Sequence, residues 1–259
     1  MILRERQDRI VSALRSGGAA SVRDLAQSLE VSESTIRRDL DLLDRNGELT
    51  RTYGGAVLRP GETVTDFGDP LRRERPFAEG HGIELKQRVA DRAASLVPDD
   101  AVVLLDIGTT TPLLARRLRG RQVTVITSNL AVLDELRDDR CVRLVMLGGV
   151  FRRNYRSFVG SLTQSALSQV SADLLFLSCT GVRPSGHVVD NMAVEAPIKQ
   201  AMIAAADQVV LLATEAKFPG TGALRLCALS DVDTVVTTNG ANPKTLDLCR
   251  NAGGQVIIA

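Results

Sequence analysis

The chain has 259 residues, of which 44% are hydrophobic and 24% charged, and its formal net charge is +1. It contains no apolar run long enough to cross a bilayer and no signal-peptide pattern, so we expect a cytoplasmic protein rather than a membrane or secreted one. The length allows one or two domains. The four cysteines are widely spaced and the two histidines lack nearby acid clusters, which predicts structural thiols and argues against a metal site.

The first sixty residues have the pattern of three helices. Residues 2–15 carry apolar side chains at helical spacing and are soon followed by a pair of glycines. Residues 21–24 have the form of a capping box and open a second, short amphipathic helix. A tight turn over residues 29–31 separates it from the third helix. Two short helices joined by such a turn are typical of a helix-turn-helix unit.

The third helix presents two different faces. Ser32 is a good N-cap, and Ile36, Leu40 and Leu43 form one apolar stripe that we expect to face inward. The opposite face and its flanks carry hydroxyl and charged side chains: Ser34, Thr35, Arg37, Arg38, Asp41 and Arg45. Arginine can bind two acceptors of a guanine edge, and hydroxyls can hold phosphate oxygens. The helix is therefore predicted to read DNA.

A second interpretation of this helix stays open. Residues 1–60 contain ten arginines and nine acidic residues, so the net charge of the region is close to zero and does not by itself indicate binding to nucleic acid. The charged face could serve only to keep an amphipathic helix in solution. The succession of three helices, with cations on one exposed face, favours DNA binding.

Residues 48–57 complete a winged helix-turn-helix. Their side chains alternate and the segment contains a Gly-Gly turn, which predicts a β-hairpin wing near the DNA backbone or the minor groove. We place the DNA-binding domain at residues 1–58. The residues expected to contact the operator are Ser32, Ser34, Thr35, Arg37, Arg38, Arg51, Tyr53, Gly54 and Gly55.

Residues 59–82 are rich in helix breakers and charged residues and are predicted to be a linker, and residues 83–259 have the pattern of a second domain. Seven short, largely apolar segments alternate there, mostly with helical ones: 101–106, 122–127, 142–147, 173–178, 209–213, 234–237 and 255–259. Such repetition predicts an open parallel sheet covered on both faces. The expected fold is a mainly α-helical winged helix-turn-helix head followed by an α/β open-sheet domain.

The turn after the first candidate strand is the strongest candidate for a ligand site, because ligands of open α/β sheets bind beyond the carboxyl ends of the strands. Gly108 lets the backbone approach a ligand, and Pro112 suits the first position of a helix. Backbone N–H groups at the helix start, with the hydroxyls of Thr109, Thr110 and Thr111, would form an anion site for a phosphate.

Alternatives to this anion site remain. The segment could be an ordinary strand-to-helix turn that Thr111 caps. Asp106 would repel a bare phosphate, so this acid is expected to accept hydrogen bonds from sugar hydroxyls or to orient the loop. Ser128 and Asn129, after the next strand, could contact the same ligand or cap the following helix. Gly149 could permit close approach or form a plain turn.

Residues 190–199 are predicted to open a helix. Glu195 and Lys199 stand at i and i+4, the favourable order for a surface ion pair, which is one interpretation of the two residues. The other is that Lys199 or Lys217 supplies a positive charge to a phosphate. The chain has only four lysines, at 86, 199, 217 and 244, beside 28 arginines.

Residues 32–40, Ser-Glu-Ser-Thr-Ile-Arg-Arg-Asp-Leu, and residues 53–56, Tyr-Gly-Gly-Ala, resemble the DeoR family of bacterial transcriptional regulators. Further matching points are residues 106–111, 127–129 and 147–149, Gly160, Gly181, Glu195 with Lys199, and Lys217-Phe218. The resemblance implies a sensor domain that is similar to ribose-phosphate isomerases and binds phosphorylated sugars. The effector-binding residues are then expected to be Asp106, Gly108, Thr109, Thr110, Thr111, Ser128, Asn129, Gly149, Gly181, Glu195, Lys199 and Lys217.

The sequence departs from the family pattern just before Lys217. Thr214 and Ala216 stand where the family usually has Asp and Ser, which indicates an altered ligand. The acids that the similar isomerases use are also missing from residues 177–182, Leu-Ser-Cys-Thr-Gly-Val. Because isomerisation needs a carboxylate base, we expect a domain that only binds.

The function expected is a DNA-binding transcriptional regulator, a repressor of sugar or polyol genes, which responds to a phosphorylated sugar and needs no cofactor. Two linked heads would gain affinity for paired half-sites, so we expect at least a dimer. A sugar-phosphate isomerase-like enzyme and a scaffold with a vestigial head are the alternatives.

Overall fold

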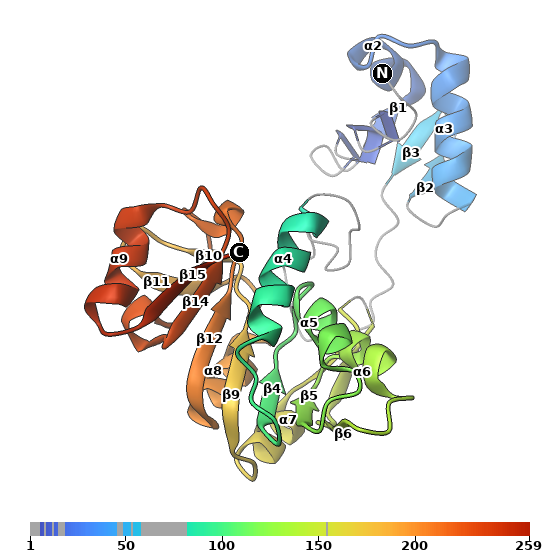
Figure 1. Ribbon diagram of the computed structural model, residues 1–259. Helices are drawn as coiled ribbons and strands as arrows, with labels where there is room; N and C mark the ends of the chain where they lie inside the picture. Colours follow the sequence, from blue (N-terminus) through green and yellow to red (C-terminus); the bar gives the residue numbers. More distant parts are fainter. Residues whose placement is uncertain are drawn as a thin grey trace. The chain divides into compact units, whose positions relative to one another are not determined.

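The computed structural model describes residues 6–7, 9–11, 13–14, 19–45, 49–52, 54–57, 82–153 and 155–259 (Figure 1). The chain divides into two compact units, residues 1–66 and residues 67–259. Of the predicted linker at 59–82, all but Gly82 lies outside the described residues. The bounds proposed for the two domains therefore stay a prediction.

The head contains the predicted helices and hairpin. The described residues between 6 and 14 are helical, and they precede α2 (Val22–Ser28) and α3 (Glu33–Arg45). Strands β2 (Thr50–Thr52) and β3 (Gly55–Val57) pair antiparallel across a turn at Gly54, whose φ of +88° favours glycine. The wing hairpin is thus confirmed. A further strand, β1 (Ala19–Ser21), pairs with β3 and was not predicted.

The core of the head confirms the apolar stripe. Ile36, Leu40 and Leu43 of α3 are at most 2% exposed and pack with the apolar residues of the first helix and α2. Ser21 caps α2 by accepting from the Asp24 N–H at 3.1 Å, as the capping box predicted. Asp39 is buried on the inner side of α3, where its carboxylate accepts from Arg6 Nε at 2.5 Å. This clamp between the first and third helices was not predicted.

The second unit is built on a seven-stranded sheet in which every pairing is parallel. Its strands are β4 (Val102–Leu105), β5 (Thr124–Thr127), β6 (Arg143–Met146), β9 (Ala172–Leu177), β12 (Ala206–Leu212), β14 (Thr234–Thr237) and β15 (Gln255–Ile258). The strand order is β15-β14-β12-β9-β4-β5-β6. Each of the seven predicted strands is present, and the predicted open parallel sheet is confirmed.

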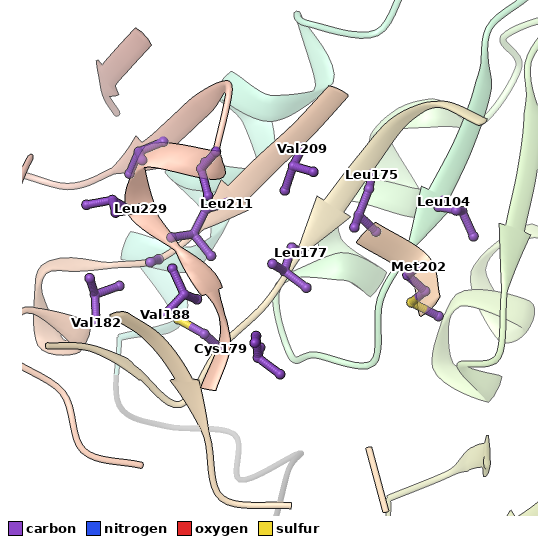
Figure 2. Packing of buried hydrophobic residues seen from close by; sticks show 14 of the residues in the cluster. Leu104, Leu175, Leu177, Cys179, Val182, Val188, Met202, Val209, Leu211 and Leu229 are labelled. Atoms are coloured by element: carbon purple, nitrogen blue, oxygen red, sulfur yellow. The ribbon is translucent and has the colours of Figure 1, made fainter. Parts of the chain in front are cut away.

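Helices cover both faces of this sheet, as Figure 1 shows. On one face lie α4 (Ile83–Ala94), α5 (Thr111–Leu118) and α6 (Leu130–Leu136), and on the other α7 (Ser161–Leu167), α8 (Ala196–Ala204) and α9 (Pro243–Asn251). Figure 2 shows part of the core beneath α7, α8 and α9: Met202 of α8 lies near Leu104 and Leu175 of the strands, and Leu211 of β12 lies near Val188 and Leu229. Successive strand residues point to opposite faces, so both helix layers bury apolar side chains.

Two smaller sheets were not predicted. Strands β7 (Val150–Arg152) and β8 (Ser157–Val159) form a hairpin, and β10 (Gly181–Val182), β11 (His187–Asp190) and β13 (Leu224–Ala228) form an antiparallel sheet.

The prediction that a helix opens at Asp190 is wrong. Asp190 pairs with Leu224 in β11, and α8 begins only at Ala196, where Pro197 suits the first turn. Short 3-10 turns lie at Glu215–Lys217 and Leu229–Asp231. None of the described helices is both long and apolar enough to span a bilayer.

The strand order places a switch point between β4 and β9. From β4 the chain proceeds to β5 and β6 on one side, and then crosses to β9, β12, β14 and β15 on the other. Loops that leave the carboxyl ends of two such strands diverge and open a crevice, which is where open α/β sheets bind ligands. Asp106 follows β4 and Ser178 follows β9, so both lie at this crevice.

Candidate functional site

The outer face of α3 presents the residues predicted to read DNA. Ser34, Arg37 and Arg38 are exposed and Thr35 is partly exposed. Ser32 caps the helix, because its Oγ accepts from the Thr35 N–H at 3.2 Å. The same Oγ lies 2.8 Å from the hydroxyls of Ser34 and Thr35, so three hydroxyls gather at the helix start. The helix carries donors and acceptors of the size and spacing that suit a groove.

The arginines predicted to contact DNA differ in whether they already form ion pairs within the protein. Arg37 donates to Glu33 at 2.6 Å, and Arg51 of the wing donates to Asp41 of α3 at 2.5 Å. Within the described residues, Arg38 is exposed and has no hydrogen-bond or ion-pair partner, so no internal interaction of its guanidinium would have to break on binding. Gly54 lies in the wing turn and Gly55 begins β3, where a Cβ would collide with the Ala20 carbonyl. Tyr53 lies outside the described residues.

In the sensor domain, Asp106 is the centre of a buried polar cluster at the switch point. Its side chain is fully buried and accepts from the N–H of Ile107 at 2.6 Å. It also accepts from the N–H and the hydroxyl of Ser178, at 2.9 and 2.5 Å. These bonds tie the loop after β4 to the end of β9. Of the two roles expected for Asp106, the geometry supports orienting the loop.

Lys199 lies at the same cluster, and its charge is already balanced there. Its Nζ is 3.0 Å from Asp106 and 2.9 Å from Asp190, and donates to the Ser178 carbonyl at 3.1 Å. Burial disfavours the charged lysine, but the two carboxylates outweigh it and raise the pKa of Lys199 above its usual range. The ammonium therefore joins β4, β9, β11 and α8. With all of these contacts in place, it is not available as a free charge for a phosphate.

Glu195 pairs with a different partner from the one the spacing indicated. The interpretation of Glu195 and Lys199 as a surface ion pair is wrong, because both side chains are buried and Glu195 accepts from Arg152 of β7. Arg152 also lies over the Tyr155 ring, with its Cζ 3.9 Å from the ring centroid. Glu195 and Lys199 do stand four residues apart, but among the described residues the ion-pair partners of each lie elsewhere in the chain.

The excess of acid in this cluster has a consequence for the pKa of Glu195. Among the residues that the structure describes, three carboxylates, those of Asp106, Asp190 and Glu195, face two cations, Lys199 and Arg152. Burial raises the pKa of Glu195 from 4.5 to about 7, against the attraction of Lys199 and Arg152. Uptake of one proton by Glu195 makes the buried group of five neutral.

The raised pKa predicts a pH dependence of stability. Between the ordinary pKa of 4.5 and about 7, the folded sensor domain retains a proton that the unfolded chain releases. The free energy of unfolding should therefore fall as the pH rises through this window. We expect Glu195→Gln to flatten this fall, while Glu84→Gln, at an exposed position on α4, leaves it unchanged. Urea unfolding at a series of pH values tests this, and an equal slope in both variants would contradict it.

The three threonines of the loop have distinct positions. Thr109 is partly exposed, whereas Thr110 and Thr111 are buried. Thr111 is not the cap that was considered. It is the first residue of α5, and its hydroxyl donates to the carbonyls of Asp106 and Gly108 at 2.7 and 3.0 Å. Thr110 precedes the helix without a side-chain capping bond. The loop is thus closed on itself, with Thr109 as its accessible hydroxyl.

Asn129 confirms the capping role considered for it and also reaches the loop. It accepts from the Ala131 N–H at 2.9 Å and caps α6, while its Nδ2 lies 3.3 Å from the Thr111 hydroxyl. Ser128 is fully buried, and its hydroxyl has no partner among the described residues.

The three predicted glycines are required by contacts within the protein. A Cβ on Gly108 would come within 2.6 Å of the Ser178 hydroxyl. On Gly149 it would collide with Thr163, and on Gly181 with Gly220. Glycine at these positions therefore serves packing between segments. Gly108 alone stands in the loop at the switch point, where a ligand could also approach the backbone.

Lys217 has a different environment from Lys199. It is partly exposed in the turn after β12, and its side chain has no hydrogen-bond or ion-pair partner in the described part of the chain. The turn lies beside the segment after β9, because the Gly220 N–H donates to the Val182 carbonyl at 3.0 Å. Lys217 follows β12 and the loop of residues 107–111 follows β4, so both lie at the edge of the sheet where the parallel strands have their carboxyl ends.

Lys86 is a residue that sequence reasoning missed. It lies in the first turn of α4, and its ammonium is close enough to Lys217 for the two charges to repel. Burial, together with this repulsion, lowers the pKa of Lys86. Two lysines without a carboxylate partner among the described residues form a local positive site. The rarity of lysine in this arginine-rich chain was the one signal that could have found it.

The four cysteines are free thiols. Burial raises the pKa of Cys179 and of Cys227 to about 12, so both remain protonated and unreactive. Among the described residues, no group of three or more His, Cys, Asp or Glu side chains could hold a metal ion.

Comparison with known proteins gives matches for both units. Residues 6–60 match the model of a DeoR-like helix-turn-helix domain, and residues 82–239 match that of the DeoR C terminal sensor domain. The transcriptional regulator GolR of Listeria innocua is 30% identical over 98% of each chain. A putative aga operon transcriptional repressor of Escherichia coli O157:H7 is 29% identical over 98% of this chain and 93% of its own.

Solved structures show looser likenesses. A D-ribose-5-phosphate isomerase in complex with phospho-erythronic acid aligns with a TM-score of 0.38 and 16% identity, over 52% of this chain and 53% of its own. A probable sor operon regulator from Shigella flexneri aligns with a TM-score of 0.41 and 10% identity, over 65% of this chain and 90% of its own.

A helix-turn-helix head followed by a sensor domain defines the class of protein as a ligand-responsive transcriptional regulator. Both family models match, and the model of the sensor domain, residues 82–239, alone spans more than half of the chain. The chain belongs to the DeoR family.

Proposed function

We propose that this protein is a cytoplasmic repressor whose affinity for operator DNA changes when a phosphorylated sugar or polyol binds to the sensor domain. The observation that supports the proposal most is that the loop after β4 and two lysines without ion-pair partners among the described residues lie at the carboxyl-end edge of the sheet. The loop of residues 107–111 lies at the switch point between β4 and β9. Lys217 is close enough to act electrostatically on Cys179, just after β9, and on Lys86 at the start of α4. Backbone N–H groups and unpaired cations are the groups that bind a phosphate.

The buried cluster reduces the objection that Asp106 would repel an anion. Lys199 lies 3.0 Å from this carboxylate and offsets its charge, and the side chain of Asp106 is fully buried. The phosphate would then bind toward Lys217 and Lys86, and the sugar hydroxyls toward Thr109 and Gly108. Asp106 and Lys199 hold the loop, so they act as positioning residues in this proposal.

Relatives support the ligand class. A 30% identical protein of Haemophilus influenzae, which covers 90% of this chain and 88% of its own, is a glycerol-3-phosphate regulon repressor. An L-fucose operon activator of Escherichia coli K12 is also 30% identical, over 90% and 93%. The first name concerns a regulon for a polyol phosphate ester, and the second an operon for a sugar.

The domain is proposed to bind its effector without converting it. Asp106 and Asp190 are buried and engaged with Lys199, and the residues directly after β9 are Ser178, Cys179 and Thr180. Removal of a proton from a sugar carbon needs a carboxylate placed over that carbon. The described residues at the mouth of the site supply hydroxyls and lysines instead, which favours binding over isomerisation.

The experiment is a thermal-shift screen of sugar and polyol phosphates, followed by a gel shift on the promoter of the gene itself. We expect Lys217→Met to weaken binding of the best ligand about 10- to 100-fold, since a charge-assisted bond to phosphate is lost. Lys244→Met is the matched control, because Lys244 is an exposed lysine on α9. Equal loss in both variants, or turnover of the ligand by the purified protein, would contradict the proposal.

A further inference from the structure

Two carboxylates lie on the surface of the head that is predicted to meet DNA. Glu33 is exposed in the first turn of α3, and Asp41 is partly exposed about two turns further along the same helix. Residues four apart on a helix are neighbours, so Glu33, Arg37 and Asp41 form a row along α3. A negative charge at such a surface opposes binding, because duplex DNA carries one negative charge for about every 1.7 Å of its axis.

Each of these carboxylates accepts from an arginine of the predicted DNA interface. Arg37 donates to Glu33 at 2.6 Å within α3. Arg51 of β2 donates to Asp41 at 2.5 Å, so the second pair joins the wing to α3. The four side chains are between 33% and 56% exposed. Ion pairs as accessible as these contribute little to stability, so both pairs can open while the head remains folded.

The two pairs leave little net charge on this surface. Arg38 is the third arginine that is predicted to contact DNA from the described part of the head, and it lies outside both pairs. The three arginines bring a charge of +3 and the two acids a charge of −2, so the set sums to +1. Attraction to the phosphate backbone is independent of sequence and supplies essentially all of non-specific binding. This attraction is therefore weak for the head.

An ion pair that has to open changes what DNA binding gains from its arginine. A free arginine that contacts a phosphate releases the cation condensed there, and this release favours binding at low salt. An arginine that leaves a carboxylate exposes the acid beside the negative duplex, where the acid attracts a cation in turn. The release and the uptake nearly cancel. Glu33 and Asp41 thus subtract from the electrostatic part of the affinity.

We propose that Glu33 and Asp41 restrain binding of the head to DNA of arbitrary sequence, by holding Arg37 and Arg51 in ion pairs that a phosphate has to displace. Arg38 is outside both pairs, so its contact with a base edge is not restrained in this way. A regulator must find its operator among a large excess of competing sites, and weak sequence-independent attraction keeps it from being held at them. The proposal requires that α3 and the wing meet DNA, and it does not depend on which effector the sensor domain binds.

The test measures the affinity of the full chain for a random duplex and for the promoter of its own gene, at a series of salt concentrations. We expect Asp41→Asn to strengthen binding to the random duplex about 3- to 10-fold and to steepen the slope of log affinity against log salt by about one. Glu33→Gln should act in the same direction, and the double variant more strongly. Both replacements remove the charge and keep the size of the side chain. Unchanged thermal melting shows that each variant remains folded.

Glu30→Gln is the matched control. Glu30 is an exposed acid in the turn between α2 and α3 and has no ion-pair partner in the described part of the chain. Its replacement removes the same charge from the head, so it separates the release of an arginine from a general change in net charge. We expect its effect on the random duplex to be smaller than that of Asp41→Asn.

Three results would overturn the inference. The first is unchanged binding of both acid variants to the random duplex, and the second is an equal gain in Glu30→Gln. The third is a loss confined to the promoter, which would show that a carboxylate accepts from a cytosine amino group in the major groove. All three leave the regulator function intact, whereas a wild type that binds neither duplex would overturn that function together with this inference.

Discussion

Replacing Lys199 by methionine is expected to lower the free energy of unfolding of the sensor domain by about 3–5 kcal/mol, the cost of removing one partner from a buried ion pair. Methionine fills much of the volume of lysine but leaves Asp106 and Asp190 facing each other without a cation. Both carboxylates lie within 3.0 Å of the ammonium in the native protein. Urea unfolding of the full chain measures the loss.

A double variant makes this prediction specific. Lys199→Met with Asp190→Asn removes one negative charge together with the cation, so it should recover part of the stability that the single variant loses. Hydrogen exchange should locate the damage at β4 and β9, since Lys199 joins the two strand ends through Asp106 and Ser178. The head, a separate compact unit, should keep its protection. A loss below about 1 kcal/mol would contradict a stabilising role for Lys199.

The parallel sheet was predictable because its strands are short apolar runs. Residues 102–105 and 174–177 are buried almost throughout, and such runs between helical segments leave few alternatives to a parallel sheet. The smaller sheets could not be predicted in this way. β7, β8 and β10 have only two or three residues each, too few to establish a period, and their pairing depends on tertiary contacts.

The candidate site was predictable in its place but not in its internal contacts. The turn after β4 was identified because ligands bind at the carboxyl ends of parallel strands. The partners of Glu195 and Lys199 were not, because local spacing shows only the i, i+4 neighbour. Arg152 lies in β7, Asp106 follows β4 and Asp190 ends β11, which belong to three different sheets, so only the tertiary fold brings them together. Short-range rules describe a helix surface well and a buried charge cluster poorly.

The same limit applies to the recognition helix. Its outward face followed from a repeat of 3.6 residues, which the sequence displays directly. The ion pairs at this helix could not be predicted from the same repeat, because one of them joins Asp41 of α3 to Arg51 of the wing. The state of each arginine in the free protein affects how much DNA binding gains from it, since a guanidinium that must leave a carboxylate loses that interaction.

Replacing Arg38 by alanine is expected to weaken operator binding about 10- to 100-fold, corresponding to the 1–3 kcal/mol of a bidentate contact with a guanine edge. Arg38 is exposed on α3 and has no partner within the described residues, so the free protein has no ion pair to break. Arg37→Ala should cost less, because Arg37 already donates to Glu33 at 2.6 Å. Quantitative gel shifts at fixed salt measure both affinities.

The control for this comparison is Arg23→Ala, which removes an exposed arginine from α2 rather than from the recognition helix. If Arg38 reads a base, its loss should reduce the preference for operator over random DNA and should change the salt dependence little. A contact to phosphate would have the opposite signature, weakening all sequences alike and lowering the salt slope by about one. Equal effects of Arg38→Ala and Arg23→Ala on operator affinity would remove the outer face of α3 from the DNA interface, and with it the assignment of α3 as the recognition helix.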